Sequence, residues 1–126
     1  MEPKNIKLIE KARFLIRSRK KDFFHQIGAA LRTRSGKEFA AVHLEANVGR
    51  VAVCAEAVAI GMAASEGDTE IEVIVAVNAE GNVVSPCGMC RELISDYSPS
   101  AQVIISGAVG ECIVAIDELL PNKYRA

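Results

Sequence analysis

The sequence predicts one three-layer α/β/α domain, a mixed five-stranded sheet with helices on both faces. The first observation is that helical and strand patterns alternate along the chain after an initial hairpin, as they do in domains that cover a sheet with helices. The second is that half of the 126 residues are apolar, which supplies one hydrophobic core. No repeat, low-complexity tract or linker divides the chain, so we expect a single domain over residues 1–126.

The N-terminal part of the chain predicts an amphipathic helix followed by a β-hairpin. Residues 4–20 place apolar side chains at roughly helical spacing, with Lys and Arg residues between them. Residues 25–33 and 38–44 have strand patterns, and Ser35-Gly36 between them is a turn signal. We therefore expect the first two strands to be antiparallel.

The middle of the chain predicts a buried helix and a central strand. Residues 50–65 are rich in alanine and end near Gly67, which suits the C-terminus of a helix that begins near Cys54. Residues 71–78 are rich in Val and Ile with little alternation, as expected of a strand covered on both faces.

The C-terminal part predicts one more helix and the last two strands. Pro86 suits the opening of a helix that runs to about Tyr97, because proline fits the first helical turn. Two strands at 101–106 and 112–116 and a helical turn at 117–120 complete the expected fold.

Charge is balanced overall but unevenly spread. The net charge is −1, yet residues 1–37 hold eleven of the 15 Lys and Arg residues. A basic arm for nucleic acid is one interpretation, and the solvated face of an amphipathic helix is the one we favour, because apolar residues interleave with the charges. No signal pattern and no apolar stretch near the ~20 residues of a membrane span are present. We expect a soluble cytoplasmic protein.

The four cysteines do not suggest a disulfide framework. Cys87 and Cys90 lie three apart at a helix start, and Cys54 lies beside a glutamate. Cys112 lies in an apolar run, and we expect a buried inert thiol. This distribution favours a reducing compartment and thiolates that bind a metal.

Cys87 and Cys90 can reach one metal ion, because residues three apart share a helical face. Alone, the pair also fits a thioredoxin-like redox site or two core cysteines. Cys54 favours the metal site over these two alternatives, since it lies at the start of another predicted helix and is followed two positions later by Glu56. Three thiolates and an open fourth position for water are typical of catalytic zinc. We expect one zinc ion per subunit.

Two short motifs resemble the cytidine deaminase superfamily, in its compact nucleoside-acting branch. They are the Cys-Ala-Glu at 54–56 and the Pro-Cys-Gly-x-Cys-Arg at 86–91. Ser85 and the Leu-Leu-Pro-x-x-Tyr at 119–124 resemble the blasticidin S deaminases in particular. The resemblance implies a homo-oligomer, with a tetramer expected, and hydrolytic release of ammonia from cytidine, deoxycytidine or a blasticidin S-like nucleoside.

The expected chemistry assigns Glu56 as the proton carrier. A zinc-activated water attacks the ring carbon that bears the amine, and Glu56 takes the proton of that water and delivers it to the ring nitrogen. Deamination of another amino-heterocycle or of a nucleic-acid base, and a non-catalytic zinc-stabilised module, are the alternatives. Nucleic acid is disfavoured because residues 38–126 are acidic and aromatic residues are few.

The resemblance also implies the substrate-binding residues. His43 and Glu45 stand where relatives carry an Asn-x-Glu that binds sugar hydroxyls, and Ala55 lies within the catalytic motif. Phe24 is a candidate for stacking on the base. Tyr124 corresponds to an aromatic residue that reaches a neighbouring subunit's pocket.

One departure from the family concerns the charge of the metal site. Relatives with three cysteines often carry an arginine directly after Cys-Ala-Glu, where this chain has Ala57. Three thiolates leave a zinc site with a formal charge of −1, which opposes acidification of water. We expect Arg91 or Arg50 to offset this charge, with a plain surface role for Arg50 as the alternative.

Overall fold

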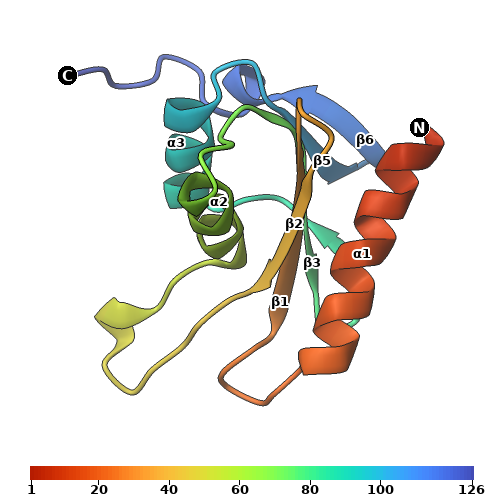
Figure 1. Cartoon of the computed structure of the whole chain (residues 1–126), viewed down its shortest axis with the longest axis vertical. Helices are drawn as coiled ribbons and strands as arrows, with labels where there is room; N and C mark the ends of the chain where they lie inside the picture. Colours follow the sequence, from red (N-terminus) through yellow and green to blue (C-terminus); the bar gives the residue numbers. More distant parts are fainter.

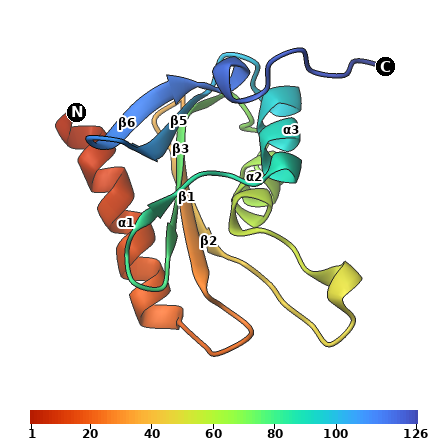
Figure 2. The ribbon, with the colours of Figure 1, turned by 180° about the vertical axis from the view of Figure 1, so that it is seen from behind.

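The chain folds as three layers, with a β-sheet between one helix and a pair of helices. The computed structural model describes all 126 residues. One helix lies against one face of the sheet and two helices cover the other face (Figure 1), as the reverse view also shows (Figure 2). The helices are α1 (Pro3–Arg19), α2 (Ala55–Ser65) and α3 (Gly88–Tyr97), with short 3-10 turns η1 (Gly49–Val51) and η2 (Ile116–Leu119). The predicted three-layer α/β/α arrangement is confirmed.

The sheet is mixed, as predicted. Its main path runs β2-β1-β3-β5-β6, and only the β3–β5 pair is parallel. The long strands are β1 (Ile27–Thr33), β2 (Glu38–Val42), β3 (Ile71–Asn78), β5 (Gln102–Gly107) and β6 (Gly110–Ala115). A sixth strand, β4 (Val83–Val84), pairs with the end of β3 and corrects the expected number of five. Two residues are too few to form a recognisable strand pattern.

The central strand β3 is buried because the two helical layers cover both of its faces. Val73, Val75 and Val77 pack in a cluster with α1, whereas Ile71 and Ile74 belong to the cluster under α2 and α3. These two clusters, of 12 and 10 buried residues, form the core. No helix of the chain has the length and apolar character needed to cross a membrane.

Helix α2 begins near Cys54, as the sequence suggested, whereas α3 begins two residues later than expected. The region 50–65 divides into the turn η1, an extended stretch and α2, which begins at Ala55. The extended stretch forms an isolated bridge between Val53 and Leu44, and this tertiary pairing overrides the local alanine-rich pattern. Helix α3 begins at Gly88, so Pro86 precedes the helix and Cys87 takes the N-cap position.

Candidate active site

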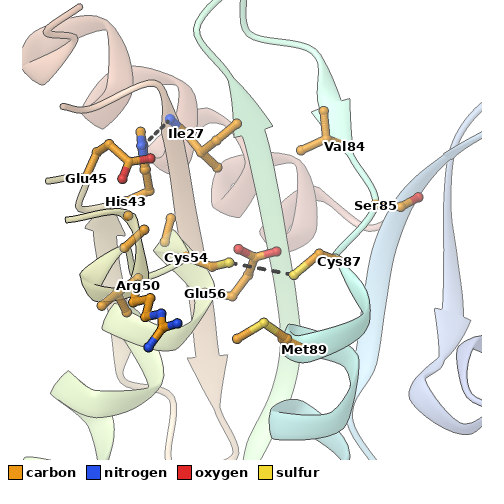
Figure 3. Close-up of a pocket in the computed structure, with 14 residues that line it drawn as sticks. Ile27, His43, Glu45, Arg50, Cys54, Glu56, Val84, Ser85, Cys87 and Met89 are labelled. Atoms are coloured by element: carbon orange, nitrogen blue, oxygen red, sulfur yellow. Dashed lines mark hydrogen bonds between the residues drawn. The ribbon is translucent and has the colours of Figure 1, made fainter. Parts of the chain in front are cut away.

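The N-termini of α2 and α3 bring three cysteines together. Cys54 is the N-cap residue of α2 and Cys87 is the N-cap residue of α3, while the buried Cys90 lies in the first turn of α3. Their Sγ atoms all lie within 4.8 Å of one another, and those of Cys54 and Cys87 are 3.6 Å apart (Figure 3). The structure therefore assembles the three residues that the motifs singled out.

The spacing of the sulfur atoms fits one zinc ion. Tetrahedral zinc with Zn–S bonds of about 2.3 Å places its sulfur ligands about 3.8 Å apart. The Cys54–Cys87 separation is close to this value, and the whole group lies within 4.8 Å. Three soft thiolates suit zinc better than magnesium or calcium, and they leave one coordination position for a reactant.

The three thiols differ in how readily they ionise. Burial raises the pKa of Cys90, and the neighbouring Glu56 carboxylate raises it further. Burial also raises the pKa of Cys54. Burial opposes ionisation of Cys87 too, but hydrogen bonds from the backbone amides of Cys90 and Met89 and from the other thiols outweigh it, so its pKa is lowered. The positive end of α3 thus favours one thiolate before any metal binds.

Glu56 lies in the first turn of α2, beside the thiol cluster. Its side chain is buried, with 6% of the residue exposed, yet it lines the cavity in front of the cysteines. Figure 3 shows its carboxylate next to the Cys54–Cys87 pair. Burial raises the pKa of this carboxyl above its ordinary value. A carboxyl group placed in this way can accept a proton from a water at the metal position and pass it to a bound ring.

Small side chains allow the start of α2 to approach the sheet. Ala55 is fully buried and packs with Ala29 of β1 and Ala76 of β3. The methyl group of Ala55 therefore faces the sheet, and a role for this residue toward a ligand belongs to its backbone. The three alanines fix the depth at which Cys54 and Glu56 sit.

A cavity of about 560 Å³ opens in front of the thiols, large enough for a nucleoside. His43, Glu45 and Arg50 line one side, and residues before and within the start of α3 line the other (Figure 3). Arg50 is the only lysine or arginine of the lining, and it forms no hydrogen bond or ion pair within the chain. Of the residues that the sequence suggested around the cysteines, the structure brings His43, Glu45, Ala55 and Arg50 to this cavity.

The structure places three other suggested residues away from the cavity lining. Phe24 is 40% exposed, packs edge-on against Phe23, and has the Lys21 ammonium 5.0 Å from its ring centroid. Tyr124 is 81% exposed near the C-terminus. Arg91 donates hydrogen bonds to the carbonyl oxygens of Pro86 and Leu119, at 2.8 and 3.0 Å, and so supports the cysteine-bearing segment.

Several residues of the cavity lining escaped sequence reasoning. Ile27 begins β1, Val84 ends β4, and Met89 lies between two cysteines with 78% of its surface exposed. Of these three residues, only Met89 could have been suggested from the sequence, because it is an apolar residue between two expected metal ligands. Such a residue is positioned to contact a molecule that binds in the cavity. Ile27 and Val84 look like ordinary strand residues until the sheet order is known.

The comparison with family models supports the assignment of the cysteines. Residues 3–106 match the model described as the cytidine and deoxycytidylate deaminase zinc-binding region. The chain is 46% identical over 128 residues to a blasticidin-S deaminase of Bacillus cereus, a match that covers 95% of this chain and 91% of that protein. It is 30% identical to a cytidine deaminase of Halalkalibacterium halodurans, over 80% of this chain and 78% of that one.

Solved structures share the fold. The crystal structure of cytidine deaminase from Mycobacterium leprae superposes with a TM-score of 0.82 at 20% identity, covering 96% of this chain and all of that one. The cytidine deaminase from Burkholderia pseudomallei gives a TM-score of 0.79 at 26% identity, covering 98% of this chain and all of that one. The order of helices and strands described above is therefore an established arrangement.

Proposed function

Because the chain belongs to the cytidine and deoxycytidylate deaminase zinc-binding family, we propose that it is a zinc-dependent hydrolytic deaminase of aminated pyrimidine nucleosides. The observation that carries the proposal is the meeting of three thiols and one buried carboxyl group at a cavity of nucleoside size. Cys54, Cys87 and Cys90 would hold one zinc ion. When bound there, zinc acidifies a water molecule and so supplies the nucleophile.

Glu56 carries the protons of the reaction. Its carboxylate accepts a proton from the attacking water and delivers it to the ring nitrogen next to the carbon that bears the amine. Glu56 then takes the remaining proton of water from the new hydroxyl group and passes it to the amine, which leaves as ammonia, so the oxygen of water stays on the ring as a carbonyl. The burial of Glu56 excludes bulk water from these transfers.

The walls of the cavity hold the rest of the nucleoside. His43 and Glu45 follow the end of β2 and line the side that would face the sugar, while Arg50 of η1 adds a cation to the same side. The 46% identity to the B. cereus blasticidin-S deaminase supports a blasticidin S-type nucleoside among the substrates, beside cytidine and deoxycytidine. The Asn-to-His change at position 43 favours a substrate that differs from cytidine on the sugar side.

We also propose a homo-oligomer, with a tetramer as the expected form. Several large apolar side chains are exposed in the single chain, and one of them, Met89, lines the cavity: Leu44, Val48, Val51, Met62 and Met89. A neighbouring subunit would cover them and could bring Phe24 and Tyr124 toward this cavity. The four free cysteines fit the reducing conditions of the cytoplasm, where we place the enzyme.

The proposal is tested by incubating the zinc-loaded protein with cytidine, deoxycytidine, blasticidin S and a set of other amino-heterocycles. We expect ammonia release from at least one of the pyrimidine nucleosides, its loss with a chelator, and its return with added zinc. Release only from bases within single-stranded RNA or DNA would replace the proposal with nucleic-acid editing. Unfolding on chelation, with no release from any compound, would indicate a structural zinc module.

A further inference from the structure

The imidazole ring of His43 is held by the first backbone amides of β1. Its Nδ1 atom accepts hydrogen bonds from the backbone N–H of Gln26 at 2.9 Å and of Ile27 at 3.3 Å; Figure 3 shows the one to Ile27. A ring nitrogen that accepts a hydrogen bond carries no proton, so the neutral ring bears its proton on Nε2. Backbone groups, which side-chain substitutions do not remove, therefore select one tautomer.

The orientation of the ring is fixed as well. The backbone N–H of His43 donates to the carbonyl oxygen of Ile27 at 3.0 Å. The carbonyl oxygen of His43 lies 2.9 Å from Nδ1 of His25, and because a carbonyl only accepts, His25 must bear its proton on Nδ1. Turning the His43 ring over would place a carbon atom against the amides of Gln26 and Ile27 and lose both hydrogen bonds.

We infer that His43 presents a rigid, donor-only Nε2–H to the cavity and selects substrates with an oxygen acceptor on this wall. His43 lines the cavity, and its Nε2 has no partner within the chain. An asparagine can turn either its oxygen or its NH₂ group to a ligand, whereas His43 in this tautomer cannot accept. A hydroxyl, ether or carboxylate oxygen suits the site, and a protonated amine does not. The inference rests on the proposed function, because it takes the ligand to be a nucleoside.

The first test examines the tautomer and requires no turnover. The chain has two histidines, so long-range ¹H–¹⁵N correlation on zinc-loaded protein labelled at histidine resolves both rings. We expect His43 protonated on Nε2 and His25 on Nδ1, with the His43 signals assigned by their loss in His43→Asn. Gln26→Ala is the matched control, since it keeps the backbone N–H and leaves the His43 pattern unchanged. A proton on Nδ1 of His43, or an average of two tautomers, overturns the inference.

The second test measures whether Nε2–H of His43 donates a hydrogen bond to a hydroxyl group of the sugar. kcat/KM is measured for cytidine, 2′-deoxycytidine and 3′-deoxycytidine with the wild type and with His43→Ala, whose methyl group can neither donate nor accept a hydrogen bond. Removing the hydroxyl that accepts from Nε2–H should cost the wild type roughly three- to tenfold and the variant little. Replacing that hydroxyl by an amine should cost the wild type more than removing it. The inference is overturned if removing the 2′- or the 3′-hydroxyl changes kcat/KM by the same factor in the wild type and in the variant.

Failure of the proposed function gives a different result, namely no ammonia from any of these nucleosides with the wild type. Binding then decides the matter, through titration of cytidine into the zinc-loaded, labelled protein. A shift of the His43 Nε2–H resonance that follows saturation supports the inference. A resonance that stays in place while other signals of the cavity shift contradicts it.

Discussion

Glu56 is the residue whose surroundings most affect the proposed chemistry. It is buried beside three thiols and still borders the cavity, so it can exchange protons with a reactant but not freely with solvent. Burial raises its pKa, which moves a carboxyl group toward the pH at which proton transfer in both directions is effective. The same burial that costs stability when the group is charged makes it a better proton carrier.

The raised pKa of Glu56 predicts the acid side of the pH profile. The reaction needs the carboxylate to accept a proton, so kcat/KM should fall as the pH drops through the raised pKa. The midpoint should therefore lie above 4.5, the ordinary value for glutamate. Initial rates across pH, with zinc content measured at each point, check this expectation. An acid limb at or below 4.5 with zinc still bound would show that another group carries the proton.

Arg50 is the one lysine or arginine of the cavity lining, and we predict that it offsets the charge of the thiolates. Ala57, where relatives often have an arginine, lines an apolar hollow of about 210 Å³ beside Cys54 and Cys90, so no cation approaches the sulfur atoms there. Arg91 uses its guanidinium on two carbonyl oxygens. Arg50 is exposed, unpaired and on the cavity wall, which leaves it free to interact with charge at the site.

Arg50→Gln should therefore lower the rate while leaving zinc content unchanged. An exposed charge interaction is worth up to about 1 kcal/mol, so we expect a two- to fivefold loss in kcat/KM, weaker at high salt. Arg19→Gln is the matched control, because Arg19 is exposed at the end of α1 and does not line this cavity. Equal kcat/KM for Arg50→Gln and the control would reduce Arg50 to a surface residue.

At the scale of elements, the site depends on how α3 is fastened to the C-terminal segment. Arg91 joins the carbonyl oxygen of Pro86, directly before Cys87, to that of Leu119 in η2. Lys123, whose side chain is only 7% exposed, forms ion pairs with Glu92 and Asp96 on α3. The last residues of the chain thus stabilise the segment that bears two of the metal ligands.

Arg91→Ala should weaken zinc binding through this connection. Loss of groups that orient metal ligands typically costs 10- to 100-fold in affinity, and we expect a value in this range by competition with a chelator. Arg91→Lys should recover little, because an ammonium group lacks the planar fork that reaches both carbonyl oxygens. Unchanged zinc affinity in Arg91→Ala would show that the contacts of Arg91 with the C-terminal segment do not affect the metal site.

The sequence predicted the elements better than their ends. Hydrophobic pattern and turn residues identify all three helices and five strands, because burial fixes the periodicity of each. The start of α3 was placed two residues too early, at Pro86, because the helix begins at Gly88 after the N-cap residue Cys87. The cysteines and Glu56 could be named from two short motifs, whereas the cavity-lining positions of Ile27 and Val84 depend on strand order.

At the scale of the whole molecule, the layers pack closely where α1 meets the sheet. A Cβ atom added to Gly28 of β1 would lie 2.8 Å from the carbonyl oxygen of Ala12 and 3.0 Å from Cβ of Ile16, both on α1. Real Cβ atoms do not approach other atoms so closely, so α1 would have to move away from the sheet. The sequence alone did not reveal this contact, because glycine in a strand also marks bulges and edges.

Gly28→Ala should therefore destabilise the fold by about 1–3 kcal/mol, the usual cost of overpacking. Gly61→Ala is the matched control, because nothing lies within 4 Å of its added Cβ. Alanine is favoured in a helix interior by about 0.8–1.0 kcal/mol over glycine, so this variant should be stabilised. Urea unfolding of both variants measures the difference. Equal stability of Gly28→Ala and the wild type would contradict the close packing of α1 on β1.

Phe24 and Tyr124 are exposed and away from the cavity of their own chain, although the sequence resemblance suggested roles for them toward a substrate. Their roles stay predictions that belong to the assembly. We propose that a neighbouring subunit covers exposed apolar side chains of this chain.

Three thiolates are proposed to hold zinc while Glu56 moves protons, and a paired measurement on Glu56→Gln separates these two roles. Zinc content and turnover are determined side by side for the wild type and Glu56→Gln, on the pyrimidine nucleoside that releases ammonia fastest. We predict one zinc ion per chain in both proteins and a 10²- to 10⁴-fold loss of kcat in the variant. Turnover of Glu56→Gln within a few fold of the wild type, with zinc bound, would contradict the account.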